Sequence, residues 1–311
     1  MPVDVLTAGE AMVLFAARET GPLEAVESFA RGTAGAELNV AIGLARLGLR
    51  VAYVTRLGND SFGRHLAAAM AREGIDTSLA TVDPAHPTGF MLKSRSDDGS
   101  DPAIEYFRKG SAASRMDADD LPHAVLASAR HLHLTGIFPA VSATTRAFVF
   151  ALADAARAAG LSISFDPNLR PRLWATKQDM VDCLGRLAAK ADWLLPGLEE
   201  GRLLTGESTP EGIAAHYLGR GARGVVVKLG PDGAYFASAS ERGFAPGVPV
   251  ARVVDTVGAG DGFAVGVVSA MLEGLTLRQA AARGNRIGAR VVQFPGDADG
   301  LPTRAELDGA A

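Results

Sequence analysis

The chain has 311 residues and carries 31 Lys and Arg against 35 Asp and Glu, so its formal charge is −4 at pH 7. Hydrophobic residues make up 48% of the chain, which excludes a disordered protein because this much apolar surface offsets the entropy of ordering. The near balance of charge gives no electrostatic reason to bind nucleic acid or an anionic membrane. The single cysteine, Cys183, excludes an intramolecular disulfide and a multi-cysteine metal site.

Neither a targeting segment nor a membrane span is visible in the sequence. Asp4 and Glu10 interrupt the apolar residues of the N-terminus, so residues 1–17 do not resemble a signal peptide. The most apolar later stretch, residues 263–272, is far shorter than the roughly 20 residues needed to cross a bilayer. We expect a cytoplasmic protein with no membrane partner and no nucleic-acid partner.

Short apolar runs alternate with helical patterns along most of the chain. The runs typical of strands buried on both faces are residues 51–55, 131–135, 161–165, 193–195 and 224–228. Helical spacing lies between them, at residues 37–47, 62–73, 144–159, 177–190 and 211–220, with Ser142 as a candidate N-cap. This repetition predicts an α/β fold with a central, mostly parallel sheet flanked by helices.

Residues 11–33 and 86–110 interrupt this alternation, because they lack a helical period and carry strand-like stretches. In the second segment, residues 89–94 and 103–108 flank the hairpin turn signal Asp97-Asp98-Gly99-Ser100. We expect the two segments to meet as a small β sheet, a lid on a single domain that spans residues 1–311. Exposed edge strands of a small sheet are usually covered, which indicates a homodimer formed through the lid.

A glycine-rich turn after the apolar pair at 253–254 is the strongest chemical signal. Gly258, Ala259 and Gly260 let backbone N–H groups approach an anion, and the helix that follows adds positive dipole character. Asp261 would repel a resting phosphate, which favours a general base beside a transferred phosphoryl group. The alternative is that Asp261 is an ordinary helix N-cap after a tight turn. A dinucleotide-binding motif fits poorly, because Phe263 stands where the third glycine is needed.

Two motifs about 220 residues apart resemble the signatures of the ribokinase (PfkB) family of carbohydrate kinases. The second signature is matched by Asp255-Thr256-Val257-Gly258-Ala259-Gly260-Asp261. The first, Gly-Gly-x-x-x-Asn-x-Ala, is matched by residues 34–41, with Ala34 in place of the first glycine. Within the family, the chain is most similar to 2-keto-3-deoxygluconate kinases on Tyr106-Phe107-Arg108, on Ser111-Ala112-Ala113-Ser114, and on residues 166–171, Asp-Pro-Asn-Leu-Arg-Pro.

The resemblance implies a ribokinase-like fold and ATP-dependent phosphorylation of the primary hydroxyl of a sugar acid, 2-keto-3-deoxygluconate, to its 6-phosphate. It makes Asp261 the catalytic base, with Gly258, Ala259 and Gly260 as the anion hole. By the same resemblance, the substrate contacts are Gly35, Asn39, Phe90, Tyr106, Arg108, Arg170 and Asp297. The residues that would bind ATP are Asn168, Arg170, Lys228, Gly230, Gly233, Gly258, Gly260 and Asn285.

The resemblance also implies cations at the site. Mg²⁺ would lie on the ATP phosphates, where the family often has Asn-x-x-Glu. Residues 197–200, Gly-Leu-Glu-Glu, lack this asparagine, and Glu199 is the acid that we assign to the metal, through an indirect contact. Several family members also bind a monovalent cation such as K⁺ near the positions of Asp255 and Val257.

The charge of the substrate can be argued from two arginines. A sugar acid carries a carboxylate, which the planar fork of arginine binds best. Tyr106 and Arg108 are two residues apart on a predicted strand and share a face, whereas Arg170 follows the carboxyl end of another strand, where α/β sheets bind ligands. The alternatives are a solvated charge for Arg108 and a structural salt bridge for Arg170.

Several alternatives remain open at this point. Asn39 and Asp297 could serve the fold, as a helix-to-loop hydrogen bond and as a capping or solvated charge. The whole protein could also be a neutral-sugar kinase of the fructokinase or ribokinase type. A third possibility is a catalytically silent nucleotide-binding protein on the same fold.

Overall fold

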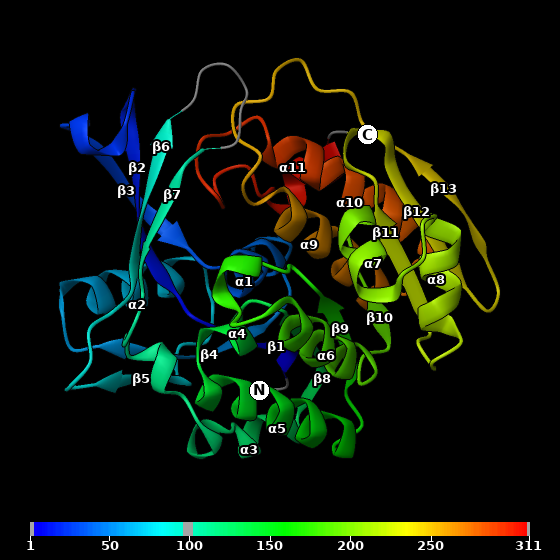
Figure 1. Ribbon diagram of the computed structural model, residues 1–311, viewed down its shortest axis with the longest axis horizontal. Helices are drawn as coiled ribbons and strands as arrows, with labels where there is room; N and C mark the ends of the chain where they lie inside the picture. Colours follow the sequence, from blue (N-terminus) through cyan, green and yellow to red (C-terminus); the bar gives the residue numbers. More distant parts are fainter. Residues whose placement is uncertain (1–2, 96–101, 310–311) are drawn as a thin grey trace.

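A nine-stranded sheet forms the centre of the computed structural model, which describes residues 3–95 and 102–309 (Figure 1). The strand order is β13-β12-β11-β10-β9-β8-β1-β4-β5. The strands from β5 to β11 pair in parallel, and β12 and β13 add an antiparallel edge. Their bounds are β1 Val3–Ala8, β4 Val51–Gly58, β5 Ala80–Asp83, β8 Ala129–Thr135, β9 Ser162–Asp166, β10 Trp193–Leu194, β11 Gly224–Lys228, β12 Gly233–Ser238 and β13 Arg242–Pro246. The predicted mostly parallel sheet is confirmed.

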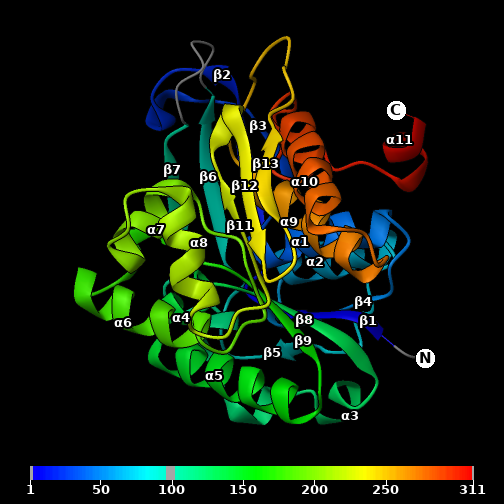
Figure 2. The ribbon, with the colours of Figure 1, turned by 90° about the vertical axis from the view of Figure 1, so that its right-hand side faces the viewer.

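Helices cover both faces of this sheet, and successive strand residues point to opposite faces, so that Val5 and Leu6 of β1 enter two different hydrophobic cores. One core includes residues of α1 Ala36–Arg46, α2 Ser61–Arg72, α9 Ala259–Leu272, α10 Leu277–Val291 and α11 Arg304–Gly309. The other includes residues of α3 His123–Leu126, α4 Phe138–Val141, α5 Ala143–Ala158, α6 Lys177–Ala188, α7 Leu198–Thr205 and α8 Pro210–Leu218. Figure 2 shows α8 and α10 on opposite sides of β11 and β12.

Several helices begin directly after a polar residue whose side chain caps the first turn. Ser142 caps α5 as expected, because its side chain accepts a hydrogen bond from the backbone N–H of Thr145. Thr176 and Thr276 cap α6 and α10 in the same way. Within the two described ranges, no helix is both long enough and apolar enough to span a bilayer.

The two segments that interrupt the alternation form a separate four-stranded sheet, in the order β3-β2-β6-β7. It consists of β2 Met12–Thr20, β3 Phe29–Ala34, β6 Phe90–Arg95 and β7 Ile104–Phe107, and it stands at the upper left of Figure 1. The predicted meeting of residues 11–33 with residues 86–110 is therefore confirmed. The turn signal at 97–100 lies outside the described residues.

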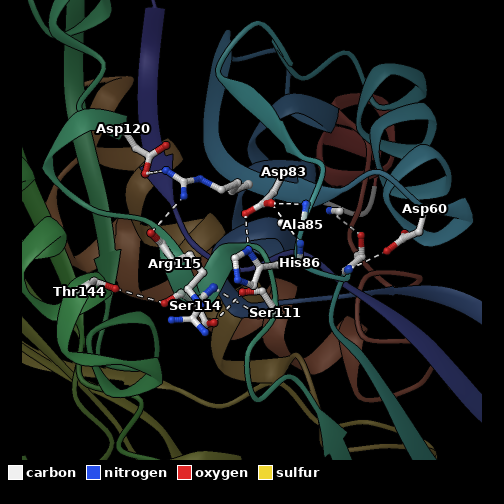
Figure 3. Close-up of polar contacts among 12 residues, drawn as sticks. Asp60, Asp83, Ala85, His86, Ser111, Ser114, Arg115, Asp120 and Thr144 are labelled. Carbon is white, nitrogen blue, oxygen red and sulfur yellow. Dashed lines mark hydrogen bonds and ion pairs between the residues drawn. The ribbon is translucent and has the colours of Figure 1, made fainter.

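Polar contacts fix the loops at the base of this small sheet (Figure 3). Before β6, Asp83 accepts the backbone N–H of Ala85 at 2.7 Å and pairs with the ring of His86 at 2.9 Å. After β7, the carbonyl of Ser114 accepts the hydroxyl of Thr144 on α5 at 3.3 Å. The small sheet is thus tied to the main body at this end.

Candidate active site

A cavity of about 900 Å³ lies between the small sheet and the carboxyl ends of β1, β9 and β11. Met91, Tyr106 and Arg108 line it from the small sheet and its exit. The opposite wall carries residues from the ends of the parallel strands and the loops after them, from the starts of α1, α7 and α9, and from the loop after α10: Glu10, Gly35, Glu37, Asn39, Asp166, Asn168, Arg170, Glu200, Lys228, Gly258, Gly260, Asp261 and Asp297. This is the place where open α/β sheets bind ligands.

Asp261 lies in the wall of this cavity and is only 8% exposed. Its Oδ2 accepts a hydrogen bond of 2.8 Å from the amide of Asn39 on α1. Burial raises the pKa of Asp261 to about 7, the bond from Asn39 opposes this shift, and the neighbouring charge of Asp166 adds to it. A carboxylate with this pKa can take a proton from an alcohol near neutral pH, which suits a general base.

The turn before Asp261 leaves backbone N–H groups available. The N-cap of α9 is Gly258, not Asp261, so Asp261 stands within the first helical turn. The backbone N–H groups of Gly260 and Asp261 precede the first intrahelical bonds and can therefore face an anion. Gly258 has φ 84° and a side chain there would overlap the carbonyl oxygen of Asp297, so only glycine fits without strain.

A lysine stands next to this turn. The Nζ atom of Lys228, at the end of β11, lies 3.7 Å from the point where a Cβ atom on Gly260 would stand. It also pairs with both carboxylate oxygens of Asp166, at 2.8 and 2.7 Å. Burial raises the pKa of Asp166 while the Lys228 charge lowers it. An anion bound at the turn would therefore meet the ammonium of Lys228.

Arg108 reaches the cavity from the exit of β7 and is buried, so it is not the solvated charge that one alternative proposed. Its Nε donates to Glu10 at 2.6 Å, and Ser111 donates to the other oxygen of Glu10. Its guanidinium also lies 5.9 Å from the ring centroid of Tyr106, which confirms that these two side chains share a face. Arg108 thus has one carboxylate partner already.

Arg170 has a different setting. It lines the cavity after β9, is exposed, and makes no ion pair within the described residues, so the alternative of a structural salt bridge is wrong. Its backbone, like that of Asn168, has a positive φ, of 44° and 37° respectively. Such strained residues collect at functional sites. The charge of Arg170 thus faces the cavity without an ion pair among the described residues.

Two predicted site residues, Phe90 and Glu199, are not in the lining of this cavity. The ring of Phe90 stacks on Phe107 with centroids 4.6 Å apart and touches the rings of Phe15 and Phe62, because alternation along β6 turns Met91 toward the cavity and Phe90 away from it. The side chain of Glu199 is 80% exposed and pairs with Arg202.

Glu200 is the acid that lines the cavity at this point. Its Oε2 accepts the backbone N–H of Gly197 at 2.7 Å, and its Oε1 accepts that of Leu169 at 3.2 Å. Counting Asn-x-x-Glu from residue 197 reaches residue 200, so correct spacing in the sequence would have identified it.

The remaining predicted residues divide into two groups. Asp297 lines the cavity but is buried and paired with Lys93, so it is neither a cap nor a solvated charge. Ala259, Gly230, Gly233 and Asn285 are not brought to this cavity. The amide of Asn285 donates to the carbonyls of Ala245 and Pro246 at the end of β13, at 3.0 and 2.9 Å, and so supports that strand.

Sequence reasoning missed Glu10, Glu37 and Lys93 as well as Glu200. Glu10 and Glu37 are buried acids in the cavity wall, and burial raises the pKa of Glu37. Glu10 follows a strand that the apolar pattern did not reveal. Lys93 is a charged residue on the inward face of a strand, and that position was its one signal in the sequence.

Residues 3–304 match the sequence profile of the pfkB family of carbohydrate kinases. The 2-dehydro-3-deoxygluconokinase of Bacillus subtilis (strain 168) is 50% identical over 99% of this chain and 95% of its own. A PfkB protein from Polaromonas sp. JS666 has a TM-score of 0.91 and 57% identity, covering 98% of this chain and 99% of its own.

A further structure, described as a ribokinase II of E. coli in complex with ATP and Mg²⁺, has a TM-score of 0.90 and 28% identity. It covers 99% of this chain and 98% of its own. The likeness in sequence and in structure extends over nearly the whole chain, including both signature motifs. The protein belongs to the pfkB family of carbohydrate kinases and has the ribokinase-like fold.

Proposed function

We propose that the protein transfers the γ-phosphoryl group of ATP to the primary hydroxyl of 2-keto-3-deoxygluconate, also called 2-dehydro-3-deoxygluconate, and releases the 6-phosphate. The observation that carries this proposal is the carboxylate of Asp261, which stands in the cavity wall beside the glycine-rich turn with a pKa of about 7. The 50% identity to the Bacillus subtilis 2-dehydro-3-deoxygluconokinase supports the choice of substrate.

In this mechanism Asp261 takes the proton of the primary hydroxyl while that oxygen attacks the γ-phosphorus, the bond from the γ-phosphorus to the bridging oxygen breaks, and ADP leaves. Asn39 holds Oδ2 of the carboxylate, which leaves Oδ1 for the hydroxyl. The backbone N–H groups of Gly260 and Asp261 face the oxygens of the transferring group, where fixed donors of this kind are each worth about 3–4 kcal/mol of the barrier. Negative charge that develops on the phosphoryl group also meets Lys228.

ATP lies on the side of the cavity formed by Asn168, Arg170 and Lys228 in this proposal. The contacts expected from Gly230, Gly233 and Asn285 remain predictions for the adenosine end, beyond the cavity described above. Mg²⁺ fits the wall near Asp166 and Glu200, because Mg²⁺ is usually bound by phosphates, water and one or two carboxylates. When bound, it would neutralise charge on the phosphates.

The carboxylate of the sugar acid is bound by arginine. Arg170 makes no ion pair within the described part of the chain. Arg108 binds Glu10 through Nε and Nη2, which leaves its Nη1 for the substrate. Gly35 allows the start of α1 to lie close to the backbone of Glu10, since a Cβ atom on residue 35 would stand 2.5 Å from the carbonyl oxygen of Glu10. Residue 35 therefore has to be a glycine for the start of α1 to pack against the backbone of Glu10 in the cavity wall.

We also propose that residues 1–311 act as one domain in which the small sheet closes over the substrate as a lid. The ring of Phe107, which is 46% exposed on the face of β7 away from the cavity, supports a homodimer that covers it. Use of ATP is consistent with work in the cytoplasm. Sedimentation of the purified protein with and without substrate tests the dimer, which a monomer at all concentrations would contradict.

An assay that couples ADP release to NADH oxidation tests the activity. We expect turnover with 2-keto-3-deoxygluconate, a 6-phosphate product by mass spectrometry and NMR, and far lower kcat/KM with fructose and ribose. Arg108→Ala should raise the KM for the acid by about tenfold or more and change little for a neutral sugar. Equal efficiency on neutral sugars would favour a fructokinase-type or ribokinase-type enzyme. No turnover on any of them, with ATP still bound, would favour a silent nucleotide-binding protein.

A further inference from the structure

Lys93 is a buried lysine that crosses from the small sheet to the main body. It stands on the inward face of β6 and is 2% exposed. Its Nζ atom lies 2.6 Å from Oδ2 of Asp255, 2.6 Å from Oδ1 of Asp297 and 3.0 Å from the carbonyl oxygen of Pro295. Burial disfavours this charge, but Asp297 and Asp255 outweigh it and keep the pKa of Lys93 above its ordinary value.

The ammonium group is fully satisfied in this position. It has three N–H donors and no acceptor, and here three oxygens accept them at short distances. The same oxygens, two from carboxylates and one from a carbonyl, are the hard ligands that an alkali metal ion prefers. A metal ion could not share them with Lys93, because the two positive charges would stand within a few ångströms of each other in a buried place.

The two carboxylate partners of Lys93, Asp255 and Asp297, are both connected to the anion-binding turn. The other oxygen of Asp255, Oδ1, accepts the backbone N–H of Val257 at 2.9 Å, which shapes the chain just before Gly258. The backbone carbonyl of Asp297 packs against Gly258 itself. One cation therefore holds both segments that position Gly258, Gly260 and the base that follows them.

We infer that Lys93 is a resident cation: its ammonium occupies the place beside Asp255 where a monovalent metal ion would bind, positions the glycine-rich turn, and makes phosphoryl transfer independent of such ions. Lys93 acts through Asp255 and Asp297 and is a positioning residue. The inference rests on the proposed kinase function for its kinetic readout alone. The fit of a free monovalent ion to this chain is poor, because the site carries its own positive charge.

The first test uses the wild-type enzyme. Activity and thermal unfolding are measured in buffers of constant ionic strength in which tetramethylammonium is replaced stepwise by K⁺ or Na⁺. We expect kcat/KM to change by less than about twofold and the unfolding temperature to stay the same. Activation by K⁺ of about tenfold or more would overturn the inference.

The second test replaces the charge. Lys93→Ala removes the ammonium and leaves space, whereas Lys93→Met removes the charge and fills the space. We expect both variants to lose about tenfold or more in kcat/KM without K⁺. K⁺ should restore activity and raise the unfolding temperature of Lys93→Ala, but not of Lys93→Met. Lys177→Met on the exposed surface of α6 is the matched control and should behave as wild type.

The outcomes separate this inference from the proposed function. Loss of activity and stability in Lys93→Ala with no specific effect of K⁺ would show a merely structural bridge and overturn the inference. If the wild type has no kinase activity on any acid or sugar, the proposed function fails. The unfolding temperature of Lys93→Ala in K⁺ against tetramethylammonium would still decide whether a cation site replaces Lys93.

Discussion

Replacing Asp261 with asparagine should abolish turnover and, at the same time, stabilise the fold above neutral pH. The carboxylate is buried, and burial raises its pKa from the ordinary 3.8 to about 7. The ionised carboxylate of Asp261 therefore lowers the stability of the native state. Asn39 donates to Oδ2 at 2.8 Å and can donate equally to the amide oxygen of an asparagine, so the variant keeps this bond.

The size of this stability change follows from the difference in proton binding between the folded and unfolded states. Below the unfolded pKa both states carry the proton and there is no cost. As the pH rises, the unfolded state ionises first, so the native state loses stability until the pH passes the folded pKa of about 7. The full cost above that pH is up to about 4 kcal/mol, and about 1.5 kcal/mol of it is present near pH 5. The free energy of unfolding of Asp261→Asn, relative to that of the wild type, should therefore increase by about 2–3 kcal/mol between about pH 5 and about pH 8.

Urea unfolding of both proteins at the two pH values, followed by circular dichroism, measures this difference. Asp154→Asn is the control, since the side chain of Asp154 is 62% exposed on α5 and should show no such trend. Calorimetric titration with ATP establishes that the variant still binds nucleotide. A variant that is less stable than wild type at the higher pH, or an advantage that does not grow with pH, would refute the view that Asp261 is a buried, strained base.

Three further predictions concern the same site. The kcat/KM of the wild type should fall about tenfold per pH unit below about 7, because the base must be unprotonated, and a profile that stays flat to pH 5 would contradict this role for Asp261. Gly258→Ala should cost at least about 1–3 kcal/mol in urea unfolding and most of the activity, because φ is 84° and the added methyl group overlaps the carbonyl oxygen of Asp297. Glu200→Gln should raise the Mg²⁺ concentration needed for half-maximal activity by about tenfold or more, whereas Glu199→Gln should leave it unchanged; the reverse order would restore the original assignment to Glu199.

Much of the fold could be predicted because buried parallel strands and amphipathic helices leave strong local patterns. The run at 224–228 became β11 with the same bounds, and Ser142 caps α5. Strand β1 was missed, although it lies between β8 and β4, because Asp4 and Thr7 interrupt its apolar run. Asp4 is accommodated by an ion pair with Arg50, which is a tertiary contact that no local pattern reveals.

The candidate site was predictable where it depends on the backbone and less so where it depends on side-chain direction. The glycine-rich turn and Asp261 follow from residue type and spacing, and the structure places them together in the cavity wall. The direction of Phe90 depends on the register of β6 against β2 in the small sheet, which a single sequence does not contain. Lys93 shows the same limit, since its partners lie 162 and 204 residues away.

The balance of charge in the cavity links the strength of the base to the kind of substrate. Among the described residues, six acidic side chains line the cavity, against four basic ones: Glu10, Glu37, Asp166, Glu200, Asp261 and Asp297 against Arg108, Arg170, Arg172 and Lys228. Two of the basic groups are already paired with Glu10 and Asp166. Burial and the neighbouring charges of Asp166 and Asp297 keep the pKa of Asp261 high, so its carboxylate binds a proton more tightly than an ordinary aspartate and is the stronger base. An anionic substrate in such surroundings needs an arginine without a carboxylate partner, and Arg170 is placed to supply it. A neutral sugar has no negative group that could pair with this arginine.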